Sequence, residues 1–232
     1  MTFTRHPLSV VNLGLVKYAQ AMDTQKKIFR DVSRGSAPNT LIVCQHYPVI
    51  TYGRLAKKTH LLVSDKVLQD KGIELYEADR GGDITYHGPG QAVFYPIVDL
   101  KHLKKDLHFY LRLLEESIVQ PLREHFGLNA YRREGLTGIW VGPYKIAFIG
   151  IGVKNWVTCH GMSLNISVDL EGFSMIKPCG LDTEVNSIAN FFKDRISFQG
   201  ICDMIIAKLK ELLEAEANSC PDFLKKGIHE RF

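Results

Sequence analysis

Residues 80–91 read Arg80-Gly81-Gly82-Asp83-Ile84-Thr85-Tyr86-His87-Gly88-Pro89-Gly90-Gln91, with four glycines, a proline and a histidine in one short stretch. Glycine adopts positive φ values and lets backbone N–H groups approach a bound molecule, while proline stiffens the turn that carries them. A long connection between two hairpin strands would have a similar composition and is the alternative. The stretch therefore predicts a loop that holds a ligand.

The composition around this loop is that of an ordinary globular protein. The chain has 232 residues, of which 45% are hydrophobic and 23% charged, and its length fits one large α/β domain or two small ones. No apolar run is long enough to cross a bilayer. The net charge is +4, but lysine and arginine are scattered among acids, which does not favour nucleic-acid binding. A basic face could still help to dock an acidic protein.

The N-terminus and the cysteines both point to a reducing compartment. Residues 1–7 contain neither a secretory apolar core nor an amphipathic presequence, so we expect a cytoplasmic, bacterial-type protein. The five cysteines include no CxxC pair and no zinc-like spacing with histidine. We therefore expect reduced thiols and no metal site.

Apolar periodicity and turn residues predict the elements on either side of the loop. Before it, we expect strands at 9–14, 40–44, 48–53 and 73–78 and helices at 16–34 and 64–71. After it, we expect a strand at 92–100, a helix at 106–126, a hairpin of 138–141 with 144–150, a strand at 158–169 and a helix at 199–217. Pro96 implies an edge or bulge position for its strand, and Pro121 a kink or break in its helix. With no repeat or linker, one mixed α/β unit with room for a small C-terminal lobe is the simplest interpretation.

Cys179 is the cysteine whose surroundings differ from those of a packing residue. It lies between Pro178 and Gly180 in a predicted loop, whereas Cys44 and Cys202 lie in apolar periodic stretches typical of the core. A thiol near its free pKa of ~8.5 is mostly protonated at neutral pH, so a nucleophilic role requires a nearby cation or base.

Lysine and histidine supply candidates for that helper. Lys145 precedes an apolar strand, where an inward-pointing side chain would be desolvated, although the pattern alone favours a lysine that starts the strand and faces water. His87 and His160 each precede a glycine in loop-like surroundings. Either could orient a ligand or be a structural histidine.

Other common catalytic motifs are missing. The chain has no GxxxxGK[ST] sequence, and Gly150-x-Gly152 lacks the third glycine of a dinucleotide-binding fingerprint. It also lacks the GxSxG motif of serine hydrolases.

Several motifs, taken together in order, resemble the octanoyltransferases of the lipoyl(octanoyl) transferase (LipB) family over most of the chain. They are His46-Tyr47-Pro48-Val49 with Thr51 and Gly53-Arg54; Arg80 to Gln91 with Tyr95-Pro96-Ile97 and Asp99-Leu100; Lys145-Ile146-Ala147 with Gly150; His160-Gly161 with Leu164-Asn165; and Pro178-Cys179-Gly180. The resemblance implies the mixed-sheet fold of biotin and lipoate protein ligases, with residues 1–232 forming one catalytic domain.

The same resemblance implies a cofactor-free acyltransferase that performs the first step of endogenous lipoate biosynthesis. The octanoyl or lipoyl group would pass from octanoyl-acyl carrier protein to a lysine of lipoyl domains in 2-oxo acid dehydrogenase complexes and the glycine cleavage H protein. Cys179 would form an acyl-thioester, and Lys145 would lower its pKa. The implied substrate-binding residues are Arg80, Gly81, Gly82, Asp83, Ile84, Thr85, Tyr86, His87, Phe148, Ile149, Gly150, Gly161, Met162 and Ser163.

Two departures and three rival functions accompany this interpretation. Family members commonly have Ala at the position of Ser163 and often Glu at that of Gln45. The nearest rival is an ATP-dependent lipoate-protein ligase of the same fold, which needs the lysine but no nucleophilic cysteine. A non-catalytic lipoyl-domain binder and a cysteine hydrolase are the others, and Cys179 together with the glycine loop favours the transferase.

Overall fold

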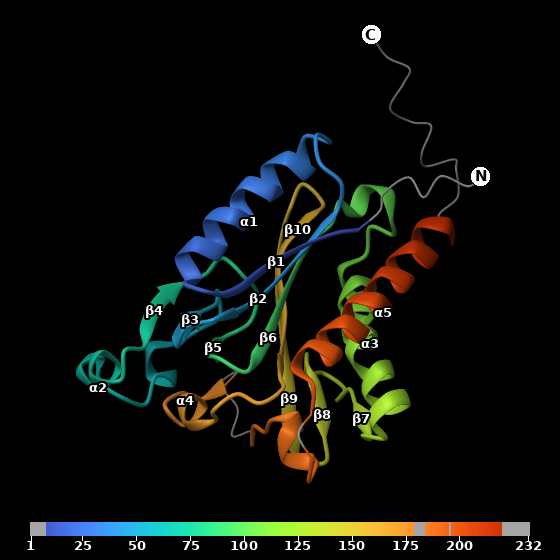
Figure 1. Cartoon of the computed structure of the whole chain (residues 1–232). Helices are drawn as coiled ribbons and strands as arrows, with labels where there is room; N and C mark the ends of the chain where they lie inside the picture. The colour runs from blue at the N-terminus through green and yellow to red at the C-terminus, as the bar shows by residue number, and fades with distance from the viewer. Residues whose placement is uncertain (1–7, 179–183, 195, 220–232) are drawn as a thin grey trace.

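The computed structural model describes residues 8–178, 184–194 and 196–219, which form a large mixed sheet, a small sheet and the helices around them (Figure 1). The seven strands of the large sheet lie in the order β1 (Ser9–Val16), β2 (Thr40–His46), β6 (Gln91–Ile97), β10 (Val157–Asn165), β9 (Tyr144–Lys154), β8 (Ile139–Val141) and β7 (Ala130–Tyr131). Strands β1 and β2 are parallel, and the other neighbours are antiparallel. The predicted mixed α/β fold is confirmed.

The second sheet has the strand order β4 (Glu74–Glu77), β3 (Val49–Tyr52) and β5 (Ile84–His87). Strand β5 lies inside the stretch predicted as a loop, so only the residues on either side of it form turns. It pairs antiparallel with β3, and Tyr86 lies opposite Ile50. The alternation of apolar and polar residues in β5 indicated a strand, but the surrounding glycines obscured it.

Three long helices cover the large sheet. Helix α1 (Tyr18–Ser33) packs on one face, and α3 (Leu107–Phe126) and α5 (Phe198–Ser219) pack together on the other (Figure 1). Each face has its own apolar core, and the larger core lies under α3 and α5. Because α5 contributes Ile205 and Leu209 to that core, the described part of the chain forms no separate C-terminal lobe.

Local signals fix both ends of helix α3. The Asp106 carboxylate accepts a hydrogen bond from the Phe109 N–H at the start of α3, and Gly127 ends this helix at φ +62°. The shorter helices are α2 (Asp65–Asp70) and α4 (Glu171–Ser174), with 3-10 turns at Lys58–His60, Leu100–His102 and Ile188–Phe191. Periodicity and capping therefore predicted the helices to within a few residues.

The prediction of an edge position for Pro96 is wrong, because β6 is a central strand between β2 and β10. Pro96 lies opposite Leu41 of β2 in regular register. On the other side, the ladder between β6 and β10 covers only Gln91 to Phe94 of β6. Pro96, which has no N–H, therefore lies beyond the end of this ladder. A central strand tolerates this proline because β10 departs from ladder geometry there.

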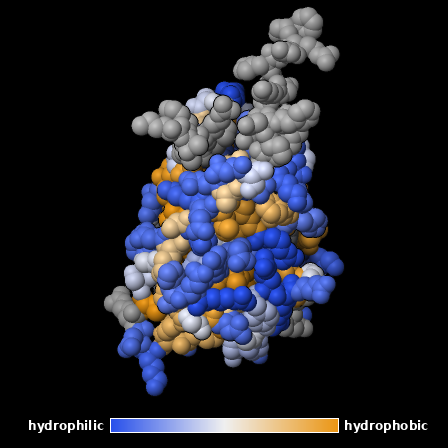
Figure 2. All heavy atoms as spheres, turned by 90° about the vertical axis from the view of Figure 1, so that its right-hand side faces the viewer, coloured by the Kyte–Doolittle hydropathy of each residue, from blue (hydrophilic) through white to orange (hydrophobic). Residues whose placement is uncertain are grey.

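The surface over α3 and α5 is mainly hydrophilic, with small apolar patches between the charged side chains (Figure 2). Among the described residues, no helix combines the length and the low charge that a membrane span requires.

Candidate active site

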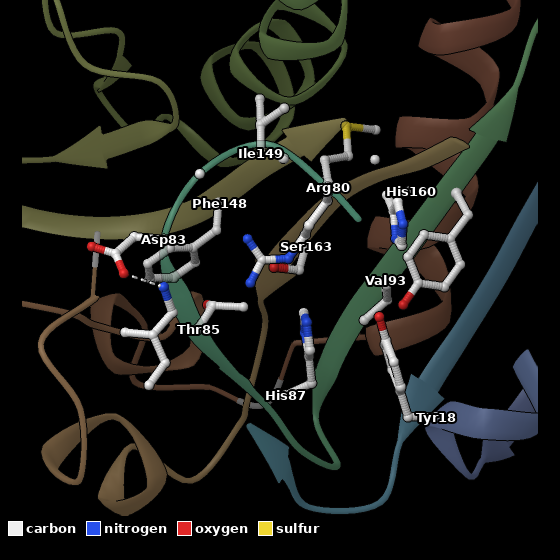
Figure 3. A pocket seen from close by; sticks show the side chains of 16 residues that line it. Tyr18, Arg80, Asp83, Thr85, His87, Val93, Phe148, Ile149, His160 and Ser163 are labelled. Atoms are coloured by element: carbon white, nitrogen blue, oxygen red, sulfur yellow. Dashed lines mark hydrogen bonds between the residues drawn. The ribbon is translucent and has the colours of Figure 1, made fainter. Parts of the chain in front are cut away.

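An elongated cavity, here called the inner cavity, lies among β5, β6, β9, β10 and the start of α1. Asp83, Thr85 and Phe148 lie at one end, and Tyr18 and His160 at the other (Figure 3). Its lining comprises Tyr18, Arg80, Gly82, Asp83, Ile84, Thr85, His87, Val93, Tyr95, Phe148, Ile149, Gly150, His160, Gly161, Met162 and Ser163.

Arg80 reaches into the middle of this cavity from the loop before β5 (Figure 3). Its guanidinium is held by donation from Nη2 to the Thr51 backbone carbonyl at 3.0 Å and to Thr51 Oγ1 at 2.8 Å. The loop also docks on β9, where Gly81 N donates to Ile151 O at 2.8 Å. A Cβ at Gly150 would lie 2.7 Å from the Gly81 carbonyl oxygen, so this close approach requires glycine.

His87 lies on the lower wall in Figure 3, and its contact with Gln91 defines its tautomer. Its Nδ1 lies 2.6 Å from Gln91 Oε1, and Gln91 Nε2 donates to Asn165 Oδ1 at 2.9 Å. Because the amide oxygen of Gln91 can only accept, His87 Nδ1 carries the proton. Burial, with a contribution from nearby His46, lowers the pKa of His87 to about 3, so the ring is neutral.

The same hydrogen-bond chain continues toward Lys145. Asn165 Nδ2 donates to the Asn186 carbonyl at 3.1 Å, and Asn186 N donates to the Lys145 carbonyl at 3.1 Å. A rigid polar chain therefore joins the wall of the cavity to the strand that carries the lysine.

Lys145 is 2% exposed, so the alternative in which it faces water is wrong. Its Nζ lies 5.0 Å from the centroid of the Trp140 ring and 4.9 Å from that of Phe148, which lines the inner cavity. Such positions over aromatic faces favour a cation. Gly138 makes room for the stem, because a Cβ there would lie 2.6 Å from Lys145 Cε.

Cys179 lies outside the described residues, but both described flanks of its segment are anchored near this end of the cavity. On one side, Lys177 N donates to His60 O at 2.8 Å, and His60 Nδ1 lies 2.7 Å from Asp83 Oδ2. On the other side, Lys145 N donates to Glu184 O at 2.8 Å.

The described cysteines are poor nucleophiles. Burial raises the pKa of Cys44 and of Cys202 to about 12 and that of Cys159 to about 11. All three therefore remain protonated near neutral pH. The assignment of Cys44 and Cys202 to the core is confirmed, since both are buried.

Most of the substrate-binding residues implied by the resemblance line the inner cavity, and Gly81 and Tyr86 do not. Gly81 forms the backbone contact with β9 described above. Tyr86 points to the other side of β5, where its ring packs edge-on against Phe173 at a centroid distance of 5.4 Å. Strand alternation explains this result, because Thr85 and His87 on either side of Tyr86 face the cavity.

Sequence reasoning did not single out Tyr18, Val93 or Tyr95 as cavity residues, and it proposed His160 only as one of two histidines. Val93 and Tyr95 alternate along β6, which is buried on both faces, so periodicity gives no preference for the cavity side. Tyr18 begins a helix, and only the packing of α1 on β10 and β6 brings it to the site.

Comparison with known proteins identifies the family of the chain. Residues 17–210 match the model of the lipoyl protein ligase A/B catalytic domain. An octanoyltransferase of Caldicellulosiruptor bescii is 42% identical over 200 residues, which cover 85% of this chain and 88% of that protein. An octanoyltransferase of Cytophaga hutchinsonii is 41% identical over 231 residues, which cover 91% of this chain and 94% of that protein.

Solved structures of the same architecture are more distant in sequence. A lipoate-protein ligase A bound with ATP superposes with a TM-score of 0.74 at 17% identity, covering 95% of this chain and 94% of that one. A putative lipoate protein ligase from T. acidophilum with bound lipoic acid gives 0.70 at 18% identity, covering 90% and 86%. These likenesses show the fold alone. The family model and the octanoyltransferase relatives together show that the chain belongs to the octanoyltransferases of the lipoyl protein ligase A/B catalytic-domain family.

Proposed function

We propose that this acyltransferase moves an octanoyl group from octanoyl-acyl carrier protein to a specific lysine of a lipoyl domain through a thioester on Cys179. Octanoyl transfer in protein lipoylation follows from the family, and the donor, the thioester and the named residues are the proposal. The observation that carries it is the burial of Lys145 at the Phe148 end of a cavity, beside the chain that flanks Cys179.

The inner cavity supports an acyl-binding role. Its described walls are largely apolar, from Phe148 and Ile149 to Val93 and Met162. An alkyl chain in contact with these side chains would be removed from water, at a gain of about 0.8 kcal/mol per buried CH₂. The neutral state of His87 fits this environment, because a charged ring would oppose an apolar ligand.

The proposed reaction balances without ATP or a metal. The Cys179 thiolate, paired with the Lys145 ammonium, attacks the donor thioester carbonyl, so a new C–S bond forms and the old one breaks. The departing carrier thiolate takes a proton from Lys145 Nζ. The acceptor lysine amine then attacks the acyl-thioester, its proton passes to Nζ, and the amide forms as the Cys179 thiolate leaves.

The proposed partners are one donor protein and two kinds of acceptor protein. The donor is octanoyl-acyl carrier protein, and the acceptors are lipoyl domains of 2-oxo acid dehydrogenase complexes and the glycine cleavage H protein. The net charge of +4 supports association with an acidic carrier protein, because complementary charge speeds encounter.

Intact-protein mass spectrometry tests the proposal. The chain is mixed with octanoyl-acyl carrier protein without ATP, beside Cys179→Ala and a matched Cys159→Ala control. We expect an octanoyl adduct in the wild type and the control, none in Cys179→Ala, and transfer of the adduct to an added lipoyl domain. Modification of the lipoyl domain only when octanoate and ATP are supplied would instead establish the rival ligase and reject the thioester.

A further inference from the structure

The inner cavity is separated by two side chains from a second, larger hollow, here called the outer groove. The outer groove has a volume of about 1020 Å³ and runs between α1, β4 and the β9–β10 hairpin. Its lining comprises Tyr18, Ala19, Met22, Asp23, Gln25, Lys26, Phe29, Arg30, Tyr76, Glu77, Ala78, Asp79, Lys154, Cys159 and His160. Tyr18 and His160 line both hollows, so they form the partition between them.

His160 lies where the ladder between β6 and β10 is interrupted. Continuing the register of Met162 with Phe94 sets His160 opposite Pro96, which has no N–H to donate. The backbone of His160 adopts φ +54°, and its N–H donates instead to Gln25 Oε1 of α1 at 2.6 Å. A non-glycine residue in this conformation persists only where its surroundings hold it.

The His160 ring is held from the outer side. Its Nε2 lies 2.6 Å from Asp79 Oδ1, and burial lowers the pKa of the ring, so the neutral ring donates from Nε2 to the carboxylate. The ring is almost fully buried, and its Nδ1 has no hydrogen-bond partner among the described residues. Leaving a buried acceptor unpaired is unfavourable, so packing alone does not account for a histidine here.

The strand spacing between the two ends of the cavity is close to the length of an eight-carbon chain. On the β9–β10 ladder, Phe148 pairs with Ser163 at one end and Ile151 pairs with His160 at the other. Three residue steps at about 3.3 Å each span about 10 Å. An extended octanoyl chain has seven C–C bonds that each advance about 1.25 Å, given a bond length near 1.5 Å, and is about 9 Å long.

We propose that His160, anchored by Asp79 and Gln25, is the end wall of the acyl site and sets the longest acyl chain that the enzyme accepts. The inference rests on the proposed function, because it takes the inner cavity as the place of the acyl chain. Without the imidazole, the inner cavity would open into the outer groove, and carbons beyond the eighth would have apolar room against Met22 and Phe29.

The test compares His160→Ala with wild type on octanoyl-, decanoyl-, dodecanoyl- and tetradecanoyl-acyl carrier protein, measuring kcat/KM for transfer to a lipoyl domain. We expect the ratio of the dodecanoyl to the octanoyl value to rise at least tenfold in His160→Ala. Cys159→Ala is the matched control, because Cys159 is the adjacent residue and lines only the outer groove; its ratio should equal that of wild type.

A second variant guards against a general folding defect. Tyr18→Ala opens the same partition from α1 and should raise the same ratio, with thermal melting recorded for both variants. An unchanged chain-length profile in both variants, with wild type active on octanoyl donor, would overturn the inference alone. Absence of transfer from every donor by wild type would overturn the proposed function itself and the inference with it.

Discussion

The two ends of the inner cavity hold ionisable side chains in different ways. At the Phe148 end, Lys145 Nζ lies against the faces of Trp140 and Phe148, which favour a cation. At the far end, His160 is neutral and is held by the hydrogen bonds that it donates to Asp79 and Gln25. Under the proposed function, the end at Lys145 serves charge and proton transfer, whereas the end at His160 limits the length of the acyl chain. Substitutions at the first should change the rate for every donor, and substitutions at the second should change which donors are used.

The largest expected effect comes from Lys145→Met. Methionine fills similar space between the two aromatic rings, so the variant should fold, and thermal melting checks this. Loss of the proton-transfer group should lower the single-turnover rate of octanoyl transfer by about 10²–10⁴ for all acyl lengths. Lys105→Met, on an exposed lysine, is the control. A variant that loses one acyl length selectively would show that this end also measures the chain.

Arg80→Lys tests the middle of the cavity. Lysine cannot reproduce the planar guanidinium, whose Nη2 donates to Thr51 while its Nη1 donates to the Gly81 carbonyl, so about 1–3 kcal/mol of unfolding free energy should be lost. Octanoyl transfer should fall for all donors together. Urea unfolding and kcat/KM measure the two effects, with Arg34→Lys on the exposed end of α1 as control. Wild-type stability in Arg80→Lys would contradict the role given to the guanidinium.

The pH dependence of stability tests two buried histidines, His87 on the cavity wall and His46 beside it. Burial lowers the pKa of His87 from 6.5 to about 3 and that of His46 to about 4. Between these values and 6.5 the unfolded chain binds more protons than the folded one, so stability is lost as the pH falls below 6.5. The slope is about 1.4 kcal/mol per pH unit for each histidine.

Urea unfolding at pH 7, 6 and 5 measures this loss. His87→Gln should show a shallower decline than wild type, and His108→Gln, at an exposed position, should follow wild type. Parallel curves for His87→Gln and wild type would refute the assignment of a neutral His87 in the folded state.

The smallest expected effect is that of Asp79→Asn at the far end. The amide can still accept from His160 Nε2, but the charge assistance is lost, so the end wall should loosen without disappearing. We expect the ratio of the decanoyl to the octanoyl kcat/KM to rise about two- to threefold, in keeping with a weakened hydrogen bond. Glu77→Gln, a neighbouring exposed carboxylate on the same groove, should leave the ratio unchanged. A narrower profile in Asp79→Asn would argue against the anchoring role.

Local patterns in the sequence were sufficient for much of the architecture. The periodicity of α1, α3 and α5 and the caps at Asp106 and Gly127 involve residues near one another in the chain, so no knowledge of packing was needed. The ordered motifs around Arg80, Lys145 and Cys179 likewise indicated the family before any geometry was known. The glycines and the proline of residues 80–91 likewise predicted a loop that holds a ligand, and the part of it before β5 lines the cavity. The strand β5 itself was not predicted.

Only the tertiary structure decided where buried polar groups lie. Lys145 is buried because β8 brings Trp140 across from it, and a contact between strands leaves no local signal. Pro96 is central because β10 breaks its ladder at His160, and that break depends on Gln25 of a distant helix. The sequence by itself determined the helices, the glycine-rich wall and the family, because these depend on short-range preferences. Pairing between remote strands determined which charges lose contact with water, and hence the two ends of the site.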